Sequence, residues 1–147
     1  MSSKTYLKDL LEKSADSLKI PYIKTTPKRL QHWGEKNKPP FIALVNVDQS
    51  AVKIRNNNLF TFTLAFVCAY DSLKDPTNEQ IQHAQDKSIS IVEDFIDLIE
   101  DDPIPKVTSS SFEEAYREGV YLGVGTAFTI TLVIGDLSDR CKKRCDG

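Results

Sequence analysis

The sequence has few of the residues from which metal centres are usually built. It contains two histidines and three cysteines in 147 residues. Neither His32 nor His83 has metal-ligand spacing to a cysteine, and Cys141 and Cys145 lack the two further ligands of a tetrahedral zinc site. So few cysteines, and an odd number of them, argue against a secreted disulfide framework, and Cys68 is expected to be a small core residue. We therefore predict no metal site.

Motifs of nucleophilic catalysis and of nucleotide binding are also missing. There is no Gly-x-Ser-x-Gly turn. The glycines at 119–125 lead into a predicted strand, so no helix N-terminus follows them to bind a pyrophosphate. The acidic residues Glu100, Asp101 and Asp102 are consecutive, and their carboxylates would point apart instead of converging in a pocket. We predict that the protein is not an enzyme and uses no cofactor.

Neither one sign of charge nor a long hydrophobic run dominates the chain. The 19 Lys and Arg and the 21 Asp and Glu give a net charge of -2, which argues against sequence-specific or general nucleic-acid binding. No segment approaches the ~20 apolar residues of a membrane span, and the N-terminus lacks the apolar run of a secretory signal. We expect one domain over residues 1–147, without membrane contact, made in the cytoplasm or assembled there into something larger.

Two long segments alternate strictly between large apolar and small residues. They are LFTFTLAFVCAY at 59–70 and LGVGTAFTITLVI at 122–134. Alternation of this kind predicts β-strands with one apolar face toward a core and a second face of small, uncharged residues. The threonines of the second face are Thr61, Thr63, Thr129 and Thr131. A flat, uncharged face that can form hydrogen bonds either meets another subunit or is covered within the monomer; we favour contact with another subunit.

Two helices are expected from periodicity and capping signals. Apolar residues at helical spacing predict a helix over 4–18. A longer helix should begin after Pro76, where Thr77 and Gln80 match a capping box, and should end before Pro103.

The remaining strands are shorter. FIALVNV at 41–47 predicts a strand, and a second short strand should follow around 52–54 after a turn at 48–50. Residues 112–117 fit either a short helix or a short strand. Together these elements predict an α+β fold, in which an antiparallel sheet of about four to five strands packs against the N-terminal helix and one long central helix.

Two further segments are polar and charged. Residues 27–40 form a basic, proline-punctuated loop that contains Trp33, and residues 138–147 form a charged tail. Trp33 is either a contact anchor or a lid over the sheet edge. The basic residues Lys28, Arg29 and Lys36 are either solvated or in contact with a partner, and the same choice applies to the acidic helix end at 100–102.

The order of these elements resembles the tail terminator and tail completion (neck) proteins of tailed bacteriophages. The resemblance spans residues 4–137 and is one of architecture and size, carried by FIALVNV, LFTFTLAFVCAY, the helix over 77–99 and GVGTAFTITLVI. It implies a structural virion protein, a head–tail connector assembled in the host cytoplasm and located in the tail or neck. It also implies a ring of identical subunits, a hexamer or a larger ring of up to twelve-fold symmetry, with portal, neck or tail-tube proteins as further partners.

A ring protein needs contact residues between its subunits. The expected ones are Lys28, Arg29, Trp33, Lys36, Thr61, Thr63, Glu100, Asp101, Asp102, Thr129 and Thr131. The alternative is a small ligand- or peptide-binding module of a bacterial or mobile-element protein, with its site between helix and sheet near Trp33 and Tyr70.

Overall fold

The computed structural model describes residues 2–26, 29, 40–54, 57–71, 77–117 and 123–135. These residues form two helices and a five-stranded sheet, which confirms the predicted α+β class. In chain order the elements are α1 (Ser3–Ser17), β1 (Tyr22–Lys24), β2 (Phe41–Ile54), β3 (Asn57–Asp71), α3 (Asn78–Asp101), β4 (Lys106–Arg117) and β5 (Gly123–Gly135). Thr77 and Gln80 form the predicted capping box at the start of α3.

The strands lie in the order β1-β2-β3-β5-β4. The pairs β2–β3, β3–β5 and β5–β4 are antiparallel, as expected. The short edge strand β1 departs from the expectation, because it runs parallel to β2. Two neighbouring parallel strands need a long connection, because the chain must return to the same end of the sheet. A two-residue hairpin turn is too short for this, whereas residues 25–40 between β1 and β2 are long enough. The sheet is therefore mixed.

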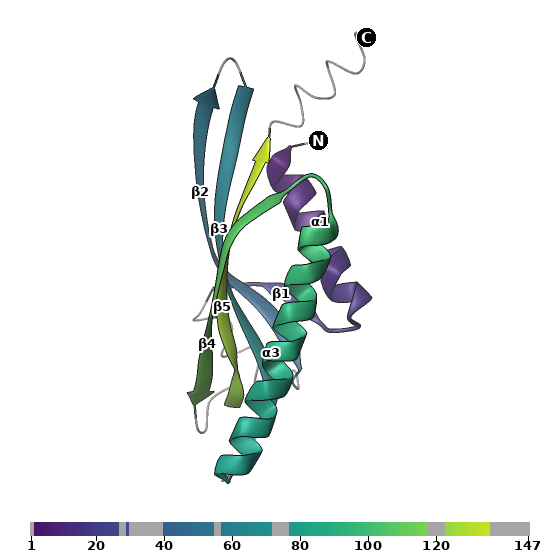
Figure 1. The fold of residues 1–147 in the computed structure, drawn as a ribbon, viewed down its shortest axis with the longest axis vertical. Helices are drawn as coiled ribbons and strands as arrows, with labels where there is room; N and C mark the ends of the chain where they lie inside the picture. Colours follow the sequence, from purple (N-terminus) through teal and green to yellow (C-terminus); the bar gives the residue numbers. More distant parts are fainter. Residues whose placement is uncertain are drawn as a thin grey trace.

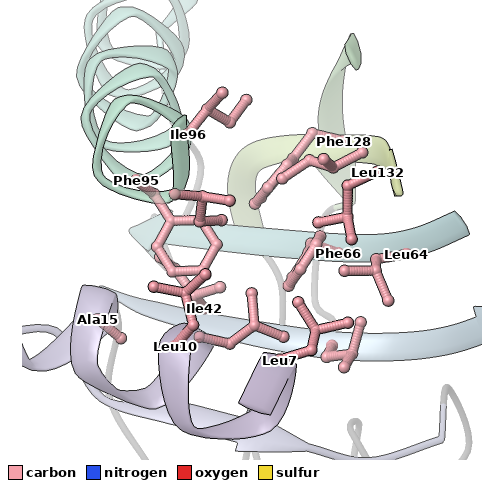
Figure 2. Close-up of a cluster of buried hydrophobic side chains, with 14 of the residues drawn as sticks. Leu7, Leu10, Ala15, Ile42, Leu64, Phe66, Phe95, Ile96, Phe128 and Leu132 are labelled. Carbon is pink, nitrogen blue, oxygen red and sulfur yellow. The ribbon is translucent and has the colours of Figure 1, made fainter. Parts of the chain in front are cut away.

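Both helices cover the same face of the sheet (Figure 1). α1 lies beside β1 and over β2 and β3, whereas α3 lies over β3, β5 and β4. The side chains between them form the main core, as predicted from the alternating strands (Figure 2). At its centre the Phe66 and Phe128 rings stack at 4.7 Å between centroids, and Phe95 of α3 meets both edge-on. Each buried ring contributes roughly 1.5–3 kcal/mol to folding.

β2 is one continuous strand, so the expected turn at 48–50 and separate short strand at 52–54 are wrong. The pairing with β3 contains a bulge between Leu44 and Asn46. The extra residue, Val45, shifts the alternation so that Val47 joins the core while Asn46 and Asp48 point away from it. With this shift the polar side chains point away from the core, and β2 therefore continues through them.

β4 is a strand along its whole length, which decides between the two alternatives for residues 112–117. Its pairing with β5 extends from Lys106 to Arg117. The pattern Ser111 to Glu114 resembles a helix cap, but this segment pairs with β5 instead.

Candidate functional site

The four predicted threonines lie together on the sheet face opposite the helices. Thr63 pairs with Thr131 across β3 and β5, and Thr61 and Thr129 continue the same face two residues away on their strands. All four are half-buried, and no described helix covers them (Figure 1). We name this surface the threonine face. The flanking strands add small polar residues and two charged ones at its edges: Ser50 and Asp48 of β2, and Ser109, Ser111 and Glu113 of β4.

One part of this face is hollowed. A depression of about 440 Å³ lies over β3, β4 and β5, with Ala65, Val67 and Ala127 in its lining and Glu113 as its charged residue. Small residues on neighbouring strands create it, since they leave space that larger side chains would fill. The surface can therefore receive a shallow projection of another molecule.

The same face becomes apolar toward one end of β2 and β3. Phe41, Ala43 and Ala69 are fully buried there, and Ile23 and Val67 pack against them. Sequence reasoning missed this second cluster. Its signal was the unbroken apolar run FIALV, because a strand that is buried on both faces has no polar alternation.

The acidic end of α3 contains two exposed residues and one half-buried residue. Glu100 and Asp101 are exposed. Asp102, in contrast, accepts a hydrogen bond from the Tyr6 hydroxyl, whose oxygen lies 2.7 Å from each carboxylate oxygen, and its Oδ1 accepts another from the Ile104 amide at 2.9 Å. Burial, this hydrogen bond and the carboxylate charge together raise the pKa of Tyr6 to about 12. Asp102 thus connects α3 to α1 within one subunit.

Of the predicted contact residues in the basic loop, Arg29 is the one that the structure describes. Arg29 is exposed, and its backbone N–H donates to Thr26 Oγ1 at 3.3 Å. Lys28, Trp33 and Lys36, and the tail at 138–147, lie outside the described residues.

A groove lies between α1 and strands β1, β2 and β3, and Tyr70, near which a binding site was expected, is not among its lining residues. Its volume is about 390 Å³, and its walls are mainly apolar: Leu7, Leu11, Leu44, Val47, Phe62 and Leu64. Lys4, Lys8 and Lys24 line it together with one acid, Glu12. Burial and the nearby Glu12 charge raise the pKa of Tyr22, which also lines the groove, so its phenol stays neutral. The alternation of the strands predicted the apolar residues, but only the packing of α1 leaves a space among them.

No group of three His, Cys, Asp or Glu side chains in the described residues is arranged to hold a metal ion. None of the helices that the structure describes is long and apolar enough to cross a membrane. No protein-family model, curated protein or solved structure gives a significant match to this chain.

Proposed function

We propose that this chain is a structural virion protein of a tailed phage, which forms a ring as a tail terminator or as a head–tail neck component. The observation that carries the proposal is the threonine face. It spans β3 and β5 in the middle of the sheet, is uncharged along these strands and lies opposite the helices. Soluble monomers usually present charged residues on a solvated sheet face, whereas a permanent interface is depleted of charge at its core.

The edges of the sheet support the same proposal. In the described part of the chain, β1 pairs with Ile42, Ala43 and Leu44, and no described strand lies beside the outer edge of β2 from Asn46 to Ile54. The outer edge of β4 likewise has no described strand beside it. Long open edges promote pairing with another chain, and a protein built for assembly uses this property.

Solution mass across a concentration series tests the proposal first. We expect a discrete species of about six to twelve subunits, since closed rings are the usual result of head-to-tail contacts that close. Electron microscopy of that species should show rings. The rings should persist when a portal, neck or tail-tube protein is added. A constant monomer mass at all concentrations would contradict self-assembly.

One observation favours a second candidate, a small ligand- or peptide-binding module. The groove beside α1 has a volume within the usual range of ligand pockets and has mainly apolar walls. This candidate predicts a stable monomer that binds an apolar molecule in the groove. Light scattering therefore separates the two candidates, because the module stays monomeric when the groove is occupied.

A further inference from the structure

We propose that Phe112 of one subunit binds in the groove beside α1 of the next subunit. This inference rests on the proposed ring and names the two surfaces that would meet. It joins two features of the structure, a partly exposed aromatic residue on an edge strand and an apolar groove at the margin of the core.

Phe112 is the first of these features. It lies on the edge strand β4 and is 43% exposed. Its exposed neighbours, Ser110, Ser111 and Glu113, are polar. Among the described residues Val52 is the other large apolar side chain with such exposure. A Phe at this position costs hydration free energy in the monomer, and its complete burial in a partner would recover roughly 1–2 kcal/mol.

The groove is the second feature, and its size and lining suit a phenyl ring. Its walls are Leu, Val and Phe side chains, and its volume of about 390 Å³ exceeds the space that one ring occupies. The lysines Lys4, Lys8 and Lys24 lie among these lining residues. A partner that combines an aromatic side chain with surrounding acidic groups therefore matches both its shape and its charge.

The flank of the molecule that carries Phe112 is acidic. On α3, residues Asp86, Glu93, Asp97 and Glu100 are exposed and spaced so that they form one stripe. Leu98 marks the opposite side of the helix, because it lines the cleft against α1. At about 100° per residue, Glu93 and Glu100 lie roughly 140–160° around the axis from Leu98. The acidic stripe thus lies on the side of α3 away from α1, where β4 forms the sheet edge.

The groove lies at the other flank. Lys4, Lys8 and Glu12 of α1 line it together with β1, the strand at the opposite edge of the sheet from β4. An acidic flank with an exposed Phe and a basic flank with an apolar groove are different surfaces of the same molecule. Contact between them is head-to-tail, and a head-to-tail contact gives a ring when the rotation between subunits closes.

The test uses one variant on each surface and a matched control. Phe112→Glu removes the aromatic side chain, and Thr5→Trp places a large side chain at the groove from an exposed position of α1. We expect each to raise the concentration at which half the chains assemble by at least about tenfold. Ser17→Glu places the same charged side chain at an exposed position of α1 outside the groove and the threonine face, and we expect it to shift that concentration less than about twofold.

A mixture of the two variants gives the sharpest result. Phe112→Glu retains an intact groove, and Thr5→Trp retains an intact Phe112, so an equimolar mixture has one functional contact and should form a species of two subunits. Circular dichroism checks that each variant is folded. Should Phe112→Glu fail to fold, Phe112→Thr replaces it, since Thr suits an edge strand.

The outcomes separate this inference from the proposed function. If the wild type forms rings and both variants assemble as it does, the inference is wrong and the ring stands. If assembly depends on Phe112 and the groove but produces dimers or open polymers, the inference stands and the ring is wrong. A wild type that stays monomeric at every concentration overturns both.

Discussion

The Tyr6–Asp102 hydrogen bond is a single contact that joins the two helices. Replacing Tyr6 with Phe removes the hydroxyl donor while it retains the ring, and we expect a loss of about 1 kcal/mol in the free energy of unfolding. Urea unfolding of both proteins at neutral pH measures the difference. A control, Tyr70→Phe, removes a hydroxyl from a half-buried residue of β3 outside this contact.

The same contact predicts a dependence on alkaline pH. The phenol must be protonated to donate, and its pKa in the folded protein is raised from 10.0 to about 12. A raised pKa stabilises the folded state fully below pH 10, and this stabilisation is lost as the pH rises through 10 to 12. The stability difference between wild type and Tyr6→Phe should therefore shrink over this range. A stability difference that stays constant over this pH range would show that donation by the protonated hydroxyl does not stabilise the folded protein.

Cys68 is predicted to be chemically inert in the folded protein. It is fully buried in the core, and burial raises the pKa of its thiol to about 12, so almost no thiolate is present near neutral pH. In a Cys141→Ser/Cys145→Ser background, we expect a thiol reagent at pH 8 to react at least about a hundredfold more slowly than it does in urea. Rapid reaction without denaturant would contradict this buried position.

At the scale of one element, the start of α3 depends on its capping box. The Thr77 hydroxyl accepts from the Gln80 amide at 3.2 Å, and the Gln80 side chain accepts from the Thr77 amide at 2.9 Å. Thr77→Ala should lower the free energy of unfolding by about 1 kcal/mol, because one amide of the first turn loses its acceptor. Thr77→Ser retains the oxygen and should remain close to wild type. Equal losses in both variants would assign the effect to the methyl group.

The strands show where element-scale reasoning from sequence succeeds. Alternation predicted β3 and β5 well, because their large and small residues separate cleanly between two faces. β2 and β4 were harder, since each contains a bulge that shifts its alternation, between Leu44 and Asn46 in β2 and between Val107 and Ser109 in β4. The register shift of β3, between Ala69 and Asp71, lies at the end of that strand and leaves its alternation intact before it. A bulge depends on the partner strand, and so sequence periodicity within one strand does not reveal it.

At the scale of the whole molecule, the threonine face should tolerate charge poorly if it is an interface. Thr131→Lys places a cation in the middle of this face, and we expect it to raise the half-assembly concentration at least about tenfold, because the charge would be desolvated on contact. Ser17→Lys adds the same charge at an exposed position of α1, outside the threonine face and the acidic stripe, and serves as the control. Normal assembly of Thr131→Lys would exclude this face from the interface.

Electrostatic attraction between subunits predicts a separate effect. Arg29 is exposed in the basic segment, and Arg29→Glu should weaken assembly if this segment meets acidic residues of a neighbour. Wild-type assembly should also weaken with added salt, since the screening length is about 10 Å at 0.1 M. Sedimentation at several salt concentrations measures both. Equal assembly of Arg29→Glu and the wild type would remove Arg29 from the predicted contacts.

The sequence by itself determined the class of the fold, its two helices, its two long strands and the face of threonines. These features follow from local periodicity and capping, which are properties of single segments. Only the tertiary structure decided the parallel pairing of β1, the continuity of β2, the strand state of β4 and the groove beside α1. Each of these depends on contacts between segments distant in the chain, which is also why the sequence alone did not indicate the hydrogen bond between Tyr6 and Asp102.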